Sequence, residues 1–339
     1  FSLSPTPIAN NYAEKADLDA RKYPLELSQC TSCGHVQQRY VLDGLFEDYK
    51  YVTPKTVETY LKPMAKQLKE KYPKAKLVLE IGSNNGVFLD CLSEAGFQAV
   101  GIDPASTHPL GIKRYFSFAE SMNFKARFDI IVANNVLAHI DDLKDVFKGM
   151  ERLLSADGVI VFEVQYFPAL VDSGAFDMIY HEHMSYHTLA PLARFLRSVG
   201  LVMTEHEFIP THGGSIRVTA QKNGSACVVN ERKIDWGLFR NKVEEVRKSV
   251  RDLTEGRKVV LLGAAAKVTT MIHHCGIADR ILFACDDTPQ KQFRYIPGTG
   301  IQIRPTTELG EHPALLGAWN YEKEWRQKFP NNEFINPFP

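Results

Sequence analysis

The sequence predicts an α/β protein built around a doubly wound, mostly parallel sheet. Short runs of apolar and β-branched residues alternate with longer segments at helical spacing, and this pattern is typical of parallel strands joined by crossover helices. A similar alternation resumes at Lys258 and predicts a second, C-terminal sheet. The strand-like runs of the first sheet are 77–81, 99–103, 128–134 and 158–164.

Composition narrows the class of protein. At roughly 150 residues per domain, 339 residues predict two globular domains with a small additional module. Forty Lys and Arg balance forty Asp and Glu, so the chain lacks the positive charge that nucleic-acid binding requires. We see no apolar run that could span a bilayer and no secretory segment, and six sparse cysteines indicate a reducing compartment. We therefore expect a cytoplasmic protein that binds neither nucleic acid nor membranes.

The first two predicted parts meet at residues 60 and 61. Residues 1–60 lack a sustained period, so we expect a small, loop-rich module there. Residues 61–225 carry the first sheet and end in two strand-like runs, 201–208 and 215–221, with only six residues between them. This gap is too short for a parallel crossover and predicts an antiparallel hairpin.

Residues 226–339 are expected to form a linker helix followed by the C-terminal unit. Trp236, Phe239 and Val243 fall at positions i, i+3 and i+7 and predict one apolar face of that helix. The strand-like runs of the C-terminal unit are 258–267, 281–287 and 333–338.

A turn after the first strand predicts a nucleoside-binding site. Glu80, Gly82 and Gly86 form an E-x-G-x-x-x-G run, in which the glycines allow close backbone approach and the following helix presents N–H groups. The spacing differs from the G-x-G-x-x-G of pyrophosphate sites, and the acidic residue suits a cationic ligand. Asp103 ends the next strand, where a carboxylate can accept both ribose hydroxyls. A nucleoside that carries a positive charge is S-adenosylmethionine (SAM); the alternative is a tight turn without a ligand.

Further polar residues are expected at the same edge of the sheet. Asn84 lies inside the turn and Asn134 ends the third strand, so both complete the predicted cofactor-binding set. Asn135 and His139 follow directly. Open α/β sheets bind ligands at the carboxyl ends of their strands, which favours a functional role for this run.

A dense cluster of titratable residues occupies positions 180–187. The run Tyr-His-Glu-His-Met-Ser-Tyr-His favours acid–base chemistry, because imidazole takes up a proton near neutral pH. Metal binding is an alternative, although the H-E-x-x-H order and a third ligand are missing. A purely structural role for half-buried histidines is the other. The turn at His212, Gly213 and Ser215 either contacts a ligand or only closes the hairpin.

Segments along nearly the whole chain carry a resemblance to a known family. YHEHMSY (180–186) and HGGSIRV (212–218) are the most specific. The others are PIANNY (7–12), YPLELSQCTSCGHVQ (23–37), LFEDYKYVTP (45–54), EIGSNNGVFL (80–89), ANNVLAHIDDL (133–143), GAAAKVTTM (263–271) and DDTPQKQFRYIPGTGI (286–301). In this order they resemble the sugar C-methyltransferases that act on nucleotide-linked 4-keto-6-deoxy sugars.

The resemblance implies a class I SAM methyltransferase with a Rossmann-like sheet, a small N-terminal zinc-type module that covers the substrate, and a C-terminal Rossmann-like domain that helps hold the nucleotide diphosphate. SAM would be the cofactor, with a structural zinc ion, and a nucleotide-diphosphate sugar the substrate of a monomer or weak homodimer. Cys30 and Cys33 supply only half of the family's four-Cys zinc site. The other pair either lies upstream of the printed sequence, or is absent and packing holds the module.

The resemblance also implies roles for individual residues. His183 matches the family's general base, Tyr180 and Glu182 would position the sugar or steady its enolate, and His139 would donate to the keto oxygen when protonated. Enolate stabilisation is needed because a lone imidazole is far too weak a base for a carbon acid. The expected substrate-binding residues are Asn135, Tyr49, Tyr51, His181, His212, Gly213, Ser215 and Lys267, and Gly263 and Lys291 would lie beside Lys267 at the diphosphate. The alternatives are a surface lysine beside a packed Ala-rich turn, and aromatic core packing for Tyr49 and Tyr51.

Three other functions compete with this interpretation. An NAD(P)-dependent oxidoreductase could use two Rossmann-like sheets, but G-x-G-x-x-G is absent from both. A non-catalytic zinc-knuckle binding protein would leave the cluster at 180–187 without a purpose. An O- or N-methyltransferase would need no carbon-acid chemistry and would cause no deuterium exchange at a substrate carbon.

Overall fold

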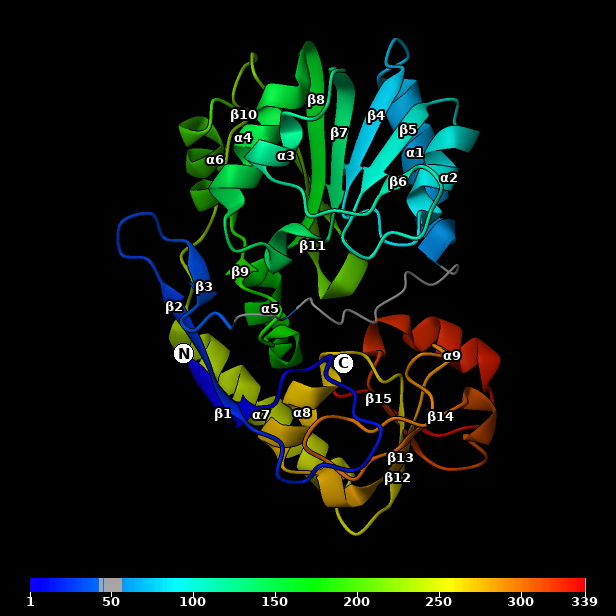
Figure 1. Cartoon of the computed structure of the whole chain (residues 1–339). Coiled ribbons are helices and arrows are strands. Elements are labelled where there is room, and N and C mark those ends of the chain that lie inside the picture. Colours follow the sequence, from blue (N-terminus) through cyan, green and yellow to red (C-terminus); the bar gives the residue numbers. More distant parts are fainter. Residues whose placement is uncertain (43–44, 46–56, 339) are drawn as a thin grey trace.

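The computed structural model describes residues 1–42, 45 and 57–338 and arranges them in three sheets. Figure 1 shows the central sheet in the upper body, the C-terminal sheet in the lower body, and the N-terminal strands alongside both. Residues at the carboxyl ends of the central strands face the lower body, so the predicted ligand edge lies toward the junction of the two bodies.

The central sheet has seven strands in the order β10-β11-β8-β7-β4-β5-β6. The pairs among β4, β5, β6, β7 and β8 are parallel, whereas β10, β11 and β8 pair antiparallel, which confirms the predicted hairpin. The bounds are β4 (Leu77–Ile81), β5 (Gln98–Ile102), β6 (Gly111–Ile112), β7 (Phe128–Asn134), β8 (Leu154–Gln165), β10 (Val202–Ile209) and β11 (Ser215–Gln221).

Helices cover both faces of this sheet, as in a doubly wound fold. Apolar residues of α1 and α2 pack on one face, and those of α4 and α6 pack on the other. In α4 the buried residues recur at helical spacing, from Val146 and Phe147 to Met150 and Leu153. The bounds are α1 (Glu58–Lys71), α2 (Val87–Glu94), α3 (Phe118–Ser121), α4 (Leu143–Leu153), α5 (Phe167–Ser173) and α6 (Leu189–Ser198).

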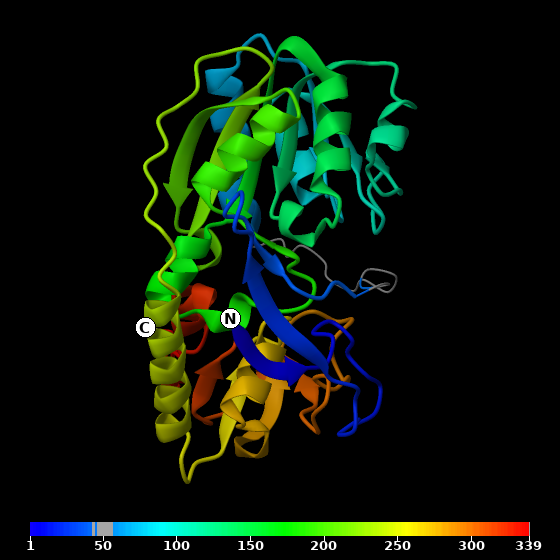
Figure 2. The same ribbon diagram turned by 90° about the vertical axis from the view of Figure 1, so that its left-hand side faces the viewer.

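The C-terminal sheet has five parallel strands in the order β14-β13-β12-β15-β16. Figure 2 shows α7 (Trp236–Leu253) running along the outside of this body; Phe239 and Val243 on the predicted apolar face are buried. The other elements are β12 (Val259–Leu262), α8 (Val268–Cys275), β13 (Ile281–Cys285), β14 (Ile303–Arg304), β15 (Ala314–Leu316), α9 (Glu322–Lys328) and β16 (Phe334–Ile335). Taking all described helices together, none is both long and apolar enough to cross a membrane.

The N-terminal part is more ordered than the sequence suggested. It forms an antiparallel sheet of β1 (Ser2–Thr6), β2 (Tyr23–Gln29), β3 (Val36–Gln38) and β9 (Ser185–Tyr186). Because β9 belongs to the titratable cluster at 180–187, the N-terminal sheet backs that cluster directly. The boundaries at 60/61 and 225/226 stay a proposal; α1 begins at Glu58, just before the first of them.

Candidate active site

The turn after β4 forms a tight, acidic cradle. Glu80 is buried, and its Oε2 has no hydrogen-bond partner among the described residues. Burial, and secondarily the nearby Asp103 carboxylate, raise the pKa of Glu80 to about 8. Gly82 and Gly86 have φ angles of 78° and 83°. A Cβ on Gly86 would lie 2.3 Å from the ring of His108, so only glycine fits there.

Asp103 and Asn84 lie together at the neighbouring strand end. The Asp103 carboxylate accepts hydrogen bonds from the backbone N–H of Asn84 (3.1 Å) and of Ala105 (2.6 Å), and burial raises its pKa. A carboxylate has about four lone-pair sites, so further donors can bind. A buried acidic cradle with an orphaned oxygen fits a cationic nucleoside, and Glu80, Gly82, Gly86, Asn84 and Asp103 are the residues that would hold SAM.

Three polar residues on successive strands share the α1 face of the sheet. Glu80, Asn134 and Glu163 follow the same inward alternation as their buried neighbours under α1. Asn134 pairs with Glu163 across the β7–β8 ladder. The Asn134 Oδ1 and Glu163 Oε2 atoms are buried and have no partner within the described ranges. This places Asn134 on the same face and at the same edge of the sheet as Glu80, and its contact with the cofactor stays a prediction.

Glu163 belongs to a partly buried network that the sequence analysis missed. Arg217 Nε donates to Glu163 Oε1 at 2.8 Å, and Arg217 Nη2 donates to the hydroxyl of Tyr60 at 2.7 Å. The Tyr60 hydroxyl donates in turn to Glu163. The network joins α1, β8 and β11 at the ligand edge. A charged residue inside the apolar run GVIVFEV was the signal that could have revealed it.

The cluster at 180–187 lies beside this edge because it is tethered to the segment after β7. In that segment the short helix η2 (Leu137–His139) is bonded twice to the cluster: Met184 N donates to the carbonyl of Ala138, and His139 Nδ1 donates to the carbonyl of Glu182, both at 2.7 Å. The rings of His139 and His183 have centroids 4.8 Å apart. The predicted catalytic histidines are thus brought together.

Hydrogen bonds fix the tautomer of His183. Its Nδ1 lies 3.0 Å from the carbonyl oxygen of Met178, which can only accept, so Nδ1 carries the hydrogen. Nε2 therefore has the lone pair and accepts a hydrogen bond from the hydroxyl of Tyr180 at 2.7 Å. His183 is 8% exposed, and burial together with His139 holds its pKa well below the usual range. The pair is a neutral imidazole bonded to a phenol.

The remaining residues of the cluster differ in their surroundings. His181 lies within hydrogen-bond distance of the Pro24 carbonyl at 3.2 Å, and His187 is buried and packs near His35. Both rings contact the N-terminal sheet rather than the His139–His183 pair, and burial lowers the pKa of each. A substrate contact for His181 stays a prediction.

Another group of predicted residues meets at the junction with the C-terminal domain. Lys267 is buried at the N-terminus of α8, 2.9 Å from Asn320 Oδ1 and 3.9 Å from Asp177 Oδ2. Its ammonium lies 3.8 Å from the ring centroid of Trp319. Burial lowers the pKa of Lys267 and raises the pKa of Asp177. The attraction between the two charges acts in the opposite direction on each pKa.

The hairpin turn reaches the same junction. A Cβ on Gly213 would lie 2.4 Å from the ring of Trp319, which explains why glycine occupies this position. Burial and the Lys267 charge lower the pKa of His212 to about 4. Ser215, at the start of β11, donates to the carbonyl of Thr211 at 3.0 Å. The junction between the two bodies thus brings together His212, Gly213 and Lys267.

Other predicted substrate residues are placed differently. Asn135 adopts a φ of 54°, and its N–H donates to the Glu163 carbonyl at 2.8 Å. Tyr49 and Tyr51 lie outside the described residues. Lys291 donates to the Ala264 carbonyl at 2.9 Å, close to the Gly263 turn.

Cys30 and Cys33 form the turn expected of half a zinc knuckle. Cys30 N donates to the His35 carbonyl and Gly34 N to the Cys30 carbonyl, both at 2.8 Å. Backbone hydrogen bonds from Cys33 and Ser32 lower the pKa of the Cys30 thiol. Among the residues that the structure describes, however, no group of three or more ligands surrounds the two thiols. Two thiolates do not close a tetrahedral zinc site, so no role is assigned to the metal.

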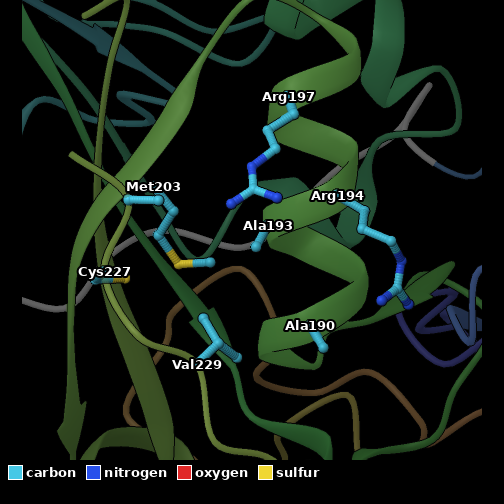
Figure 3. Close-up of a pocket in the computed structure, with 8 residues that line it drawn as sticks. Ala190, Ala193, Arg194, Arg197, Met203, Cys227 and Val229 are labelled. Atoms are coloured by element: carbon cyan, nitrogen blue, oxygen red, sulfur yellow. The ribbon is translucent and has the colours of Figure 1, made fainter. Parts of the chain in front are cut away.

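A surface cavity of about 210 Å³ lies elsewhere, between α6, β10 and the segment after β11. In Figure 3 the side chain of Arg197 points toward Met203, whereas that of Arg194 points away from it. None of the predicted site residues lines this cavity. It is therefore separate from the candidate active site.

Comparison with known proteins now identifies the family. Family models described as "Putative zinc binding domain", "Methyltransferase domain" and "C-methyltransferase C-terminal domain" match residues 1–44, 55–206 and 210–339. The C-methyltransferase NovU of Streptomyces niveus is 30% identical over 390 aligned positions, which cover 100% of this chain and 92% of NovU. The chain belongs to the C-methyltransferase family. As a C-methyltransferase it takes its methyl group from SAM, and this membership decides against the oxidoreductase and the non-catalytic binding protein.

More distant similarities cover only parts of the chain. A ubiquinone biosynthesis O-methyltransferase of Bradyrhizobium diazoefficiens is 28% identical over 25% of this chain and 38% of its own length. Among solved structures, a didemethyltoxoflavin N1-methyltransferase of Burkholderia thailandensis matches with a TM-score of 0.39 and 15% identity, over 59% of this chain and all of that one. The magnesium protoporphyrin IX methyltransferase of Synechocystis has a TM-score of 0.38 and 13% identity, over 49% and 83%.

Proposed function

We propose that this C-methyltransferase methylates a nucleotide-linked 4-keto-6-deoxy sugar at the carbon next to the keto group, by way of an enolate. The observation that carries the proposal is the Tyr180–His183 pair, a neutral imidazole hydrogen-bonded to a phenol near the edge of the sheet that carries the proposed cofactor residues. O-methylation or N-methylation would not need such a base at a carbon acid.

The pair can move a proton without creating an uncompensated charge at its buried position. As the substrate carbon loses its proton to the Tyr180 oxygen, the Tyr180 hydroxyl proton passes to His183 Nε2. The substrate becomes an enolate while His183 becomes an imidazolium, so opposite charges form together. This matters because burial alone makes His183 a weak base, and each pKa unit of mismatch costs about 1.4 kcal/mol. SAM, when bound, supplies the electrophilic methyl group.

His139 and Glu182 complete the proposed site. Burial lowers the pKa of His139, and its Nδ1–H is already donated to the Glu182 carbonyl, so we assign the neutral ring the role of orienting substrate. A bond from His139 to the keto oxygen would require a second proton on the ring. Glu182 Oε2 is buried and lacks a partner in the described part of the chain, which suits a substrate hydroxyl or amine.

The nucleotide diphosphate is proposed to bind at the junction of the two bodies. Lys267 offers a cation at the N-terminus of α8, where backbone N–H groups also favour phosphate oxygens. His212 and Gly213 flank this place from the hairpin turn. Six free cysteines are in keeping with a cytoplasmic location, and we retain a monomer or weak homodimer as the proposed assembly.

Solvent exchange tests the base. In D₂O the wild-type protein should exchange the proton next to the keto group of the sugar, whereas His183→Asn and Tyr180→Phe should lose both exchange and methyl transfer by about 10²–10⁴-fold. Tyr40→Phe is the control, because Tyr40 is exposed and belongs to none of the predicted site residues. Exchange at the wild-type rate in His183→Asn would exclude this base.

The substrate class is tested separately. The protein is incubated with methyl-labelled SAM and a panel of nucleotide-linked keto sugars, and NMR locates the label in the product. A new carbon–carbon bond next to the ketone supports the proposal. A label on oxygen or nitrogen contradicts it.

A further inference from the structure

Asn10, in the N-terminal segment, hydrogen-bonds to the carboxyl group of Glu182 in the cluster at 180–187. Its backbone N–H and its side-chain Nδ2 both donate to Oε1 of Glu182, at 2.9 and 3.0 Å. The Glu182 side chain is fully buried, and Oε2 has no hydrogen-bond partner among the residues that the structure describes. One oxygen is therefore fixed, and the other keeps unused acceptor capacity.

The main chain of Glu182 also positions the ring of His139. Its main-chain carbonyl accepts the hydrogen bond from His139 Nδ1 at 2.7 Å. His139 in turn packs against His183, with ring centroids 4.8 Å apart. A change in the position of the Glu182 main chain should therefore shift the rings of both His139 and His183.

The segment that carries Asn10 is fastened independently of Glu182. The Tyr12 hydroxyl donates to the carbonyl of Ala264 at 2.8 Å, and Lys291 Nζ donates to the same oxygen at 2.9 Å. Ala9 is buried, and its carbonyl accepts from Thr269 in α8 at 3.5 Å. Asn10 is thus anchored on the C-terminal domain and reaches into the central one.

We propose that Asn10 is a positioning residue for the methyl transfer, which orients Glu182 so that Oε2 accepts a hydrogen bond from a hydroxyl or amine of the acceptor substrate. This inference rests on the proposed function, in which Glu182 faces the substrate. The geometry has an electrostatic counterpart: burial raises the pKa of Glu182, and the two bonds from Asn10 oppose that shift. Asn10 therefore favours the ionised, accepting form.

Several titratable groups in the described part of the chain lie near Glu182. His139 approaches from η2 and Tyr186 from β9, and His181 and His183 flank it in the loop. Asn10 is the neighbour that donates two hydrogen bonds to its carboxylate.

Asn10→Ala and Asn10→Asp test the proposal, with Asn11→Ala as a matched control because Asn11 is exposed. Asn10→Ala removes one hydrogen bond to a charged group, so kcat/KM should fall about ten- to hundredfold. The acid limb of its pH profile should move to higher pH, and further in Asn10→Asp, whose carboxylate opposes ionisation of Glu182. Asn11→Ala should change neither quantity. An Asn10→Ala profile that coincides with that of Asn11→Ala overturns the proposal.

Two further measurements separate positioning from a structural role. In a Glu182→Ala background, which removes the acceptor oxygens altogether, Asn10→Ala should reduce kcat/KM by less than about twofold, because the coupled partner is gone. An undiminished loss overturns the proposal. Infrared titration of the Glu182 carboxyl band, assigned with Glu182→Gln, requires no substrate, and its midpoint should rise in Asn10→Ala. An unmoved midpoint also overturns it. If the midpoint rises but the wild-type protein methylates no keto sugar, the proposed function fails while control of Glu182 by Asn10 stands.

Discussion

Glu80 should make SAM binding depend on pH. Its carboxyl group is buried, its Oε2 has no hydrogen-bond partner among the described residues, and its pKa is raised to about 8. At pH 6 only about 1% of Glu80 is ionised in the free protein, and the cationic ligand binds best to the ionised form. The affinity for SAM should therefore fall about tenfold, or about 1.4 kcal/mol, for each pH unit below 8.

Isothermal titration calorimetry between pH 6 and pH 8 measures this dependence. Repeating the titration in buffers of different ionisation enthalpy counts the protons released, and we expect close to one per SAM near pH 6. Glu80→Gln should bind SAM weakly with a flat profile, whereas Glu94→Gln, an exposed acid at the end of α2, should behave like the wild type. A SAM affinity that is constant from pH 6 to 8, or an equal slope in Glu80→Gln, would refute the reasoning.

The same carboxyl group acts on stability in the absence of SAM. In the unfolded chain Glu80 ionises near its ordinary value of 4.5, whereas in the folded protein it stays protonated up to about 8. Between these values the unfolded state binds fewer protons, so the Glu80 contribution lowers the free energy of unfolding as the pH rises. Glu80→Gln should therefore be more stable than the wild type at pH 8 and about equal to it at pH 4.5.

Three other substitutions test the geometry of the site. Gly86→Ala should lower the free energy of unfolding by about 1–2 kcal/mol, because an L-residue at a φ of 83° is strained. The clash of the new Cβ with His108 should also weaken SAM binding. An unchanged denaturant midpoint together with an unchanged SAM affinity would contradict this prediction. Arg217→Met leaves the Glu163 carboxylate buried without its cation and should cost about 3–5 kcal/mol in urea unfolding, a loss that should shrink when Glu163→Gln is added. Lys267→Met should raise the KM for the nucleotide sugar about ten- to hundredfold, because a charge-assisted hydrogen bond to the diphosphate is lost. The KM for SAM should stay unchanged. Equal changes in the two constants would count against a diphosphate contact.

The central sheet could be predicted because its signals are local. The run at 128–134 is long and β-branched, and it coincides with β7. β14 and β15 contain two and three residues, too few to show an alternating pattern. The N-terminal sheet was missed for another reason: β3 pairs with β9, and no local pattern reports a partner so distant in the chain.

The same distinction applies to the site. The turn proposed to hold the cofactor is a local motif, so Glu80 and Gly86 could be proposed from the sequence alone. The Glu163–Arg217–Tyr60 network draws on three segments, and only the fold brings them together. The tautomer of His183 depends on the Met178 carbonyl, a backbone atom that sequence patterns do not reveal.

The pairing of β3 with β9 has a consequence for synthesis on the ribosome. Val36 pairs with Tyr186, and neighbouring His35 and Ser185 are 150 positions apart, so β3 is synthesised well before its edge partner β9. At about 5–20 residues per second, that interval lasts roughly 8–30 s. During this time the open edge of the nascent hairpin can pair with other chains. Newly made protein should therefore depend on chaperones more than refolding of the completed chain does.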